Sequence, residues 1–236
     1  MTFDEAKQEL SRKLGIDYFD IDNNGLFSET DLEAWINSGA KRAWDYKPWD
    51  FAEGDKKITS EDSEYYDYPA DFKTGSINLL LVDGKEYRKL SYQDYMRYKA
   101  NYPSGDDKVW AERKRYYFVN QNAYTVGAEI SVFGKLRFQK ITDGGDLMPF
   151  SPDEDDQESS GNQAAVLLAY AEALSSEKKK NPAQAATEEK RAFAILDNLW
   201  LPFAQQQGTQ QTDRPFFDVP DFFGESNNST IIGNFN

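Results

Sequence analysis

The sequence contains neither cysteine nor histidine. Without cysteine the chain has no disulfide framework, thiol nucleophile or thiolate metal site. Without histidine it cannot build a Ser-His-Asp triad, a Cys-His pair, histidine acid–base chemistry or nearly any catalytic zinc site. Carboxylates, lysine and tyrosine remain, but among 41 acidic residues a suggestive carboxylate pair carries almost no information. We therefore expect a protein that is not an enzyme.

Apolar and basic residues are also scarce. Hydrophobic residues make up 39% of the chain, below the usual share of a compact domain. No apolar run is long enough to cross a bilayer, and the start, MTFDEAKQEL, does not resemble a signal peptide, so we expect no membrane association. The net charge of −14 argues against a duplex-binding surface, although it suits a conduit through which DNA slides. Aromatic residues are abundant, which favours interfaces.

The first 44 residues predict a helical hairpin. Thr2 and Glu5 form a capping-box pattern, and Gly15 is a plausible helix end. Ser28 is a good N-cap for a second helix, whose apolar face begins at Leu32. Residues 1–44 are therefore expected to form two packed helices.

The middle of the chain changes from a polar to a β pattern. Residues 45–64 are expected to be a polar, irregular insertion, and residues 65–141 an antiparallel β region. Asp83-Gly84, which follows the apolar run Ile77–Val82, is a strong hairpin signal. The other expected features are strands at Lys85–Leu90, Tyr116–Val119, Tyr124–Val126, Ile130–Phe133 and Leu136–Ile141, a turn at Gly134-Lys135, and a helical turn at Ser91–Tyr98.

Helices are expected again after an acidic linker at residues 142–161. Residues 162–203 predict a C-terminal helical pair, whose second helix starts at Asn181-Pro182 and ends at Pro202. Together these patterns predict an α+β fold, predominantly helical. In this fold a helix bundle contains an inserted small antiparallel β-sheet domain and carries an extended C-terminal arm.

The arm, residues 204–236, is rich in Gln, Asn, Thr and Gly but also contains large apolar residues. These are Phe216, Phe217, Phe222, Phe223, Ile231, Ile232 and Phe235. A solvated tail has little use for them, whereas an arm that docks on another chain does. The alternative is that the arm folds back on its own domain.

Residues 20–31 fit an EF-hand calcium loop. The oxygen ligands would come from Asp20, Asp22, Asn24, the Leu26 carbonyl and Asp31, with Gly25 at the sharp turn. The closing residue is Asp where Glu is usual, and EF-hands generally act in pairs. The other reading is a helix–turn–helix connection in which Ser28 and Asp31 cap the next helix. Calcium is the one cofactor that the sequence indicates, and none is required.

A third class of function, carbohydrate binding, is suggested by the plentiful Tyr, Trp and carboxylates. Aromatic residues at helical and strand spacing are more often part of the core.

Three stretches, taken in order, resemble the head-to-tail adaptor (head-completion) proteins of tailed bacteriophages. The first runs from Leu26-Phe27-Ser28 to Trp35-Ile36-Asn37 and resembles the family's second helix. The second is Tyr68-Pro69-Ala70-Asp71-Phe72, similar to the family's entry to the sheet, followed by the Asp83-Gly84 hairpin. The third is the terminal helical pair that contains Leu167-Leu168-Ala169-Tyr170-Ala171 and Ala192-Phe193. The resemblance covers roughly residues 3–203 and rests on the order and spacing of these short motifs.

The resemblance implies a structural virion protein that sits at the head–tail interface and is made in the host bacterial cytoplasm. Such subunits form a homo-oligomeric ring, commonly a dodecamer, beneath the portal protein. The ring receives a tail or nozzle protein and completes a channel through which packaged DNA passes without sequence-specific binding. The calcium-like loop, the long 45–64 insertion and the tail after residue 204 depart from the family pattern.

Overall fold

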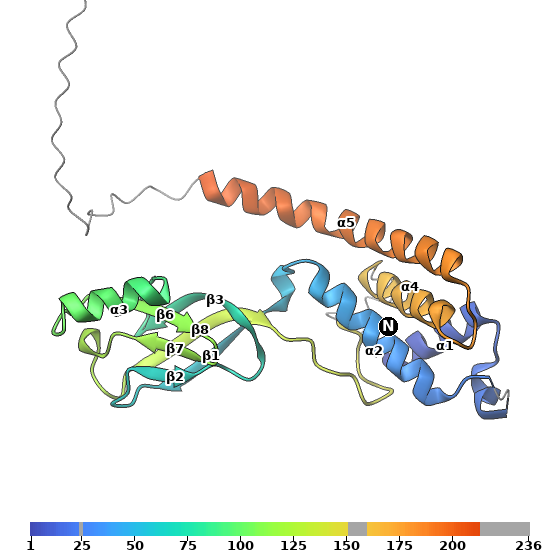
Figure 1. Cartoon of the computed structure of the whole chain (residues 1–236), viewed down its shortest axis with the longest axis horizontal. Coiled ribbons are helices and arrows are strands. Elements are labelled where there is room, and N and C mark those ends of the chain that lie inside the picture. The colour runs from blue at the N-terminus through green and yellow to red at the C-terminus, as the bar shows by residue number, and fades with distance from the viewer. Residues whose placement is uncertain (24–25, 151–159, 213–236) are drawn as a thin grey trace, which may run out of the picture.

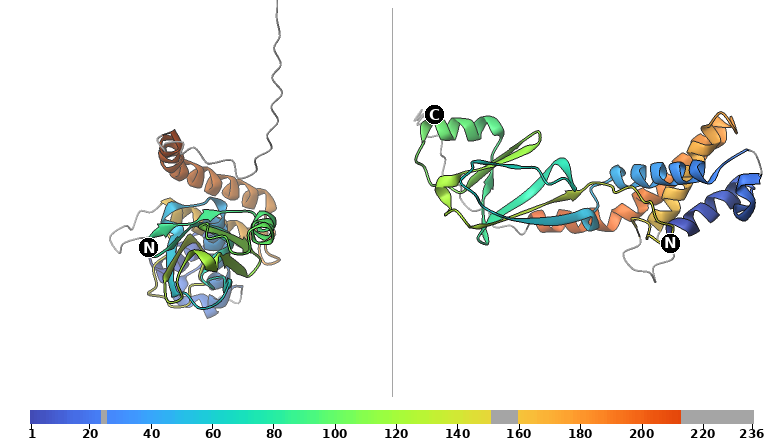
Figure 2. Two further views of the ribbon diagram at one scale, coloured as in Figure 1. Left: turned by 90° about the vertical axis from the view of Figure 1, so that its left-hand side faces the viewer. Right: turned by 90° about the horizontal axis from the view of Figure 1, so that it is seen from below.

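The computed structural model describes residues 1–23, 26–150 and 160–212, the last eleven as backbone only. Helices α1, α2, α4 and α5 gather at one end of an elongated molecule, and two β-sheets with α3 form the other end (Figures 1 and 2). We call these ends the helical part and the sheet part. The helices are α1 (Phe3–Leu14), η1 (Tyr18–Asn23), α2 (Glu29–Tyr46), η2 (Asp50–Ala52), α3 (Tyr92–Asn101), η3 (Gln121–Ala123), α4 (Ser160–Ser175) and α5 (Pro182–Thr212). The strands are β1 (Glu53–Thr59), β2 (Tyr65–Asp67), β3 (Phe72–Val82), β4 (Lys85–Glu86), β5 (Arg88–Lys89), β6 (Val109–Arg113), β7 (Tyr116–Val119) and β8 (Glu129–Leu136).

The helical part is organised around α4, which packs against α1, α2 and α5. Its alanines and leucines are buried on nearly every side, because neighbouring helices cover them. The closest approach is at Gly39 of α2: a Cβ atom there would lie 2.3 Å from the carbonyl oxygen of Ala165 and 2.7 Å from the amide nitrogen of Ala169. Glycine at this position therefore allows the two helix backbones to meet.

The sheet part contains two four-stranded sheets, in the orders β1-β8-β3-β4 and β2-β7-β6-β5. All strand pairs are antiparallel except β5 with β6, which is parallel. The two sheets share one core, with Leu80 and Ile130 from the first sheet and Trp110 and Tyr117 from the second. Helix α3 covers part of the outer face of the second sheet through Tyr95.

Several sequence predictions are confirmed. The fold is α+β, and Thr2 and Ser28 both form capping boxes at the starts of α1 and α2. The hairpin at Asp83-Gly84 is present, with both residues at positive φ (48° and 72°), as a type I′ turn requires. The Asn181 side chain caps α5 by accepting a hydrogen bond from the backbone amide of Gln184, at 3.3 Å. The finer prediction of a predominantly helical bundle is not confirmed, because the sheet part has a separate core of its own.

Five predictions about local structure are wrong. Residues 45–64 are not irregular, since they include η2 and β1; β1 was missed because its side chains are mostly exposed and polar. Tyr124–Val126 forms no strand. Of the expected strand Leu136–Ile141 only Leu136 lies in a strand, because no neighbouring strand among the described residues pairs with residues 137–141. The expected turn at Gly134-Lys135 lies inside the continuous strand β8, where Gly134 leaves room for Phe72 at a register shift between β3 and β8.

The fifth error concerns the end of the last helix. Pro202 does not end α5, which continues to Thr212. A proline inside a helix removes one backbone hydrogen bond but does not by itself terminate the helix.

The chain passes between the two parts along two neighbouring segments, one after α2 and one after β8. The Trp44 indole donates to the Leu136 carbonyl at 3.1 Å, and the Lys135 ammonium donates to the Trp49 carbonyl at 2.8 Å. The Asn37 amide binds both backbone groups of Ile141, at 2.8 and 3.0 Å. These contacts fasten the end of β8 and the segment after it to α2, and β8 to the segment that follows α2.

Candidate functional site

The predicted partner-binding residues lie outside the described residues. These residues are Phe216, Phe217, Phe222, Phe223, Ile231, Ile232 and Phe235. Their predicted role in an interface therefore stays a prediction. Helix α5, which leads to them, extends along the molecule past the other long helices (Figure 1).

The predicted calcium ligands are only partly described. Asp20 and Asp22 belong to η1, and their side chains, like Asn24 as a whole, lie outside the described residues. Leu26 is 41% exposed just before α2. Asp31 is in the first turn of α2.

The carboxylate of Asp31 has protein partners. Its Oδ2 atom accepts hydrogen bonds from the Ser28 amide at 2.9 Å and the Ser28 hydroxyl at 3.0 Å, and it pairs with the Lys178 ammonium at 2.6 Å. Burial raises the pKa of Asp31, but the hydrogen bonds from Lys178 and Ser28 outweigh it and hold the pKa below its ordinary value. A calcium ion bound by Asp31 would have to compete with Lys178.

A buried lysine organises the same end of the molecule. Lys7 is only 3% exposed, and its ammonium lies 2.8 Å from Glu29, 2.9 Å from Asp4 and 3.5 Å from Glu33. Burial lowers the pKa of Lys7, but the hydrogen bonds with Glu29 and Asp4 raise it above its ordinary value. One protonated amine thus neutralises carboxylates from α1 and α2.

Among the described residues, no group of three or more acidic side chains is arranged to hold a metal ion. Within the same ranges no helix has both the length and the apolar character needed to span a membrane.

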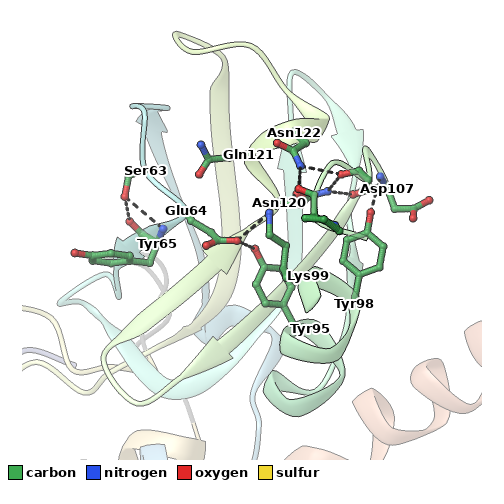
Figure 3. Close-up of polar contacts among 12 residues, drawn as sticks. Ser63, Glu64, Tyr65, Tyr95, Tyr98, Lys99, Asp107, Asn120, Gln121 and Asn122 are labelled. Atoms are coloured by element: carbon green, nitrogen blue, oxygen red, sulfur yellow. Dashed lines mark hydrogen bonds and ion pairs between the residues drawn. The ribbon is translucent and has the colours of Figure 1, made fainter. Parts of the chain in front are cut away.

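A polar cluster lies between α3 and the second sheet (Figure 3). The Glu64 carboxylate accepts a hydrogen bond from the Tyr95 hydroxyl and pairs with the Lys99 ammonium, both at 3.1 Å. Lys99 also donates to Asn120, a fully buried residue whose amide binds the carbonyls of Gly105 and Asp107. Each side chain in the cluster has at least one partner within the fold, so the cluster stabilises the fold.

Sequence reasoning missed a surface on the same sheet. Where α3 does not cover the outer face, Tyr65 (55% exposed) and Tyr116 meet edge to face, with ring centroids 5.4 Å apart. The neighbouring hairpin carries the consecutive basic residues 113–115, and the Arg113 guanidinium lies 4.4 Å from the Tyr92 ring centroid. The sequence signal for this surface was a basic triplet followed directly by two tyrosines, in a chain with a net charge of −14.

A groove of about 620 Å³ opens at the junction of the two parts, within the size range of binding pockets. Its apolar lining comes from Trp44, Leu136, Phe138, Ile141, Leu147 and Pro149. The charged side chains along it are Asp71, Arg137, Lys140 and Asp146. We call it the junction groove. It combines apolar walls, charges of both signs and a stretch of chain that is neither helix nor strand.

Comparison with models of known protein families and with curated proteins finds no match to this chain. The function therefore has to be argued from the sequence and from these surfaces.

Proposed function

We propose that this chain is a head-to-tail adaptor of a tailed bacteriophage, a structural virion protein and not an enzyme. In this proposal it forms a homo-oligomeric ring beneath the portal protein and receives a tail or nozzle protein on the other side. Helices α1, α2, α4 and α5 would act as the bundle, and the sheet part as its insertion. Packaged DNA would pass through the ring, which suits the net charge of −14.

The observation that carries the proposal is the order of the three family-like stretches. The first supplies the start and core face of α2, including Asn37, which binds Ile141. The second leads into β3. Its Tyr68 hydroxyl accepts hydrogen bonds from the backbone amides of Ser76 and Ile77, at 2.8 and 3.1 Å. The third supplies α4 and the middle of α5. The matched residues thus have defined structural roles, which supports a resemblance of whole folds.

The shape of the molecule supports the same proposal. An elongated subunit with chemically different ends can contact one partner through each end and identical neighbours along its sides. Closed cyclic symmetry would then cover the lateral surfaces. Exposed aromatic and arginine side chains, such as Tyr65 and Arg113, are typical of surfaces that bind protein.

The test is electron microscopy of the purified protein, alone and mixed with the portal protein from the same genome. We expect rings on the portal in the mixture, with a symmetry that can be counted directly. An intact portal that stays undecorated at high subunit concentration would contradict the proposal. A variant with the exposed change Glu86→Gln serves as a control for handling and should decorate normally.

The second proposal, calcium binding by residues 20–31, is favoured by one observation. Asp31 lies at the third position of α2 and is held there by the Ser28 cap, as the last ligand of such a loop would be. Calorimetric titration with calcium should show binding that Asp20→Ala abolishes. A flat titration, unchanged by the substitution, would rule this proposal out. Microscopy with and without calcium would show whether the ion also controls ring formation.

A further inference from the structure

Along one side of the junction groove, backbone N–H and C=O groups make no hydrogen bond with other described residues of the chain. After β8 the chain continues through residues 137–140 without helix or turn, and Asn37 fixes it again at Ile141. The amide and carbonyl groups of Phe138, Gln139 and Lys140 have no hydrogen-bond partner among the described residues. Free backbone groups beside an apolar groove are the features that bind an extended peptide by β-addition.

The side chains of the groove suit an extended apolar peptide. Trp44 forms one wall and is itself held in place by edge-to-face contacts with Phe51 and Phe150, at 5.8 and 6.4 Å between ring centroids. Arg137 and Lys140 form no ion pair among the described residues, so acidic side chains of a bound peptide can pair with them.

The chain has a segment with this chemistry beyond the end of α5. Residues 213–225 contain two Phe-Phe pairs, Phe216-Phe217 and Phe222-Phe223, together with four acidic residues and one basic residue. Large apolar residues would fill the groove. Its charged side chains are two of each sign, and the acidic residues of the segment would pair with Arg137 and Lys140. No other stretch outside the described residues is as apolar.

The position of α5 indicates which copy supplies the segment. Helix α5 packs against α4, on the side of α2 opposite to residues 137–149 (Figure 1). Trp200 of α5 contacts Trp49 near the groove, but α5 continues beyond Trp200 to Thr212, so an arm that leaves its end would have to turn back along α5 to reach its own groove. The 24 residues after Thr212 span up to about 80 Å when extended, which is ample for a neighbouring copy.

We infer that the junction groove binds the C-terminal arm, residues 213–236, of a neighbouring copy of this chain. The bound arm adds as an extended strand along residues 137–140 and inserts phenylalanine side chains between Trp44 and Leu147. This inference deepens the proposed function by assigning a contact between ring neighbours, and it can fail or hold independently of that function.

Disulfide trapping tests the inference directly, because the chain has no cysteine of its own. One full-length chain carries Lys140→Cys, beside the groove, and a second, distinguishable by mass, carries Gly224→Cys in the arm. We expect disulfide-linked pairs of the two chains to form several-fold more readily than pairs of Gly224→Cys with the control Glu86→Cys, an exposed position on β4. Equal yields for the two pairs would overturn the inference.

Two further variants identify the mechanism and the copy. Gln139→Pro removes one free amide donor, whereas the matched Gln139→Ala keeps it; trapping at Lys140→Cys should fall with proline and persist with alanine. Equal trapping in both would rule out strand addition. A single chain with both cysteines, oxidised at high dilution, should remain unlinked; an internal disulfide there, without pairs, would assign the groove to the chain's own arm and overturn the inference.

The outcome separates this inference from the proposed function. Rings on the portal without trapping would leave the adaptor proposal standing and remove the arm contact. Trapping without rings on the portal would support the arm contact and contradict the adaptor proposal.

Discussion

The two parts of this molecule build their cores in different ways. The helical part packs alanine and aliphatic side chains around α4, so closely that Gly39 has no room for a side chain. The sheet part buries tyrosines, whose hydroxyls bind carbonyls: Tyr66 bonds to Glu61, Tyr87 to Ala123 and Tyr124 to Ser63. Long helices satisfy most of their own backbone groups, whereas β2, β4, β5, β6 and β7 have only two to five residues each and leave many loop carbonyls to be satisfied. The two cores thus differ more in how backbone groups find hydrogen-bond partners than in how hydrophobic they are.

The pKa values of the buried tyrosines reflect this design. Burial raises the pKa of Tyr87 to about 12, and it likewise raises the pKa values of Tyr95 and Tyr117 above the ordinary value. The sheet part therefore has a core of neutral hydroxyl groups, while the helical part contains one buried cation, Lys7. Substitutions that weaken the core of one part and not that of the other test this comparison.

The largest effect is expected at the helix contact. Gly39→Leu should destabilise the protein by about 3 kcal/mol or more, because α2 and α4 must separate to admit the side chain. Urea unfolding followed by circular dichroism measures the change. Ala34→Leu, at an exposed position of the same helix, is the control and should be nearly neutral. A small effect of Gly39→Leu would mean that the two helices are not tightly packed.

The next effect is expected in the sheet part. Asn120→Leu should cost about 2–3 kcal/mol, since it removes the three hydrogen bonds of this buried side chain, with Lys99 and with the carbonyls of Gly105 and Asp107. Tryptophan fluorescence reports on this part through Trp110. Asn122→Leu is the matched control, because Asn122 also binds the Gly105 carbonyl but is exposed. Equal losses for both variants would contradict the role assigned to buried amides.

Removing the buried cation should have a smaller effect with a defined pH dependence. Lys7→Met should cost about 1–2 kcal/mol, because Asp4, Glu29 and Glu33 are partly solvated. The folded-state pKa of Lys7 is raised, so its contribution is fully present below the unfolded pKa of about 10.4 and disappears as pH rises through the folded value. The stability difference from the parent should thus stay constant from neutral to mildly alkaline pH and shrink only at higher pH. Lys13→Met, a surface pair with Glu9, should change little.

The smallest effect is expected at a single tyrosine hydroxyl. Tyr124→Phe removes the contacts to the Ser63 carbonyl at 3.0 Å and to the Tyr66 hydroxyl at 2.8 Å, and should cost about 1 kcal/mol. Thermal unfolding measures it. Tyr102→Phe, at an exposed position, should be neutral. An effect as large as that of Asn120→Leu would indicate that the hydroxyls act as one network.

Helix starts were predictable from the sequence because they depend on local chemistry. Thr2, Ser28, Ser91 and Asn181 each cap a helix as expected, since a cap needs only its own side chain and the next turn. The hairpin at Asp83-Gly84 was predictable for the same reason.

The errors came where a distant part of the chain decides the outcome. Strand β1 is polar because it is held by pairing with β8 instead of by burial of its side chains. Gly134 resembles a turn residue, yet it lies in a strand where a side chain would crowd Phe72 and Ile77 of another strand. The junction groove could not be predicted either, since its lining comes from α2, the end of β8 and the segment up to Pro149. For the predicted arm residues, the structure bears only on the helix that leads to them.

The pairing of β1 with β8 has a consequence for how the chain can be rearranged. Glu53 lies opposite Lys135, so the chain enters and leaves the sheet part at adjacent points. The sheet part, which lies between these two points in the sequence, is thus attached to the helical part through the paired strands β1 and β8. A short turn joining residue 52 to residue 137 would span the gap between β1 and β8. Helices α1, α2, α4 and α5 would then keep their order, and α1, α2 and α5 would keep their contacts with α4. The elongated molecule is therefore a closed helical module on which a second, exchangeable module is mounted.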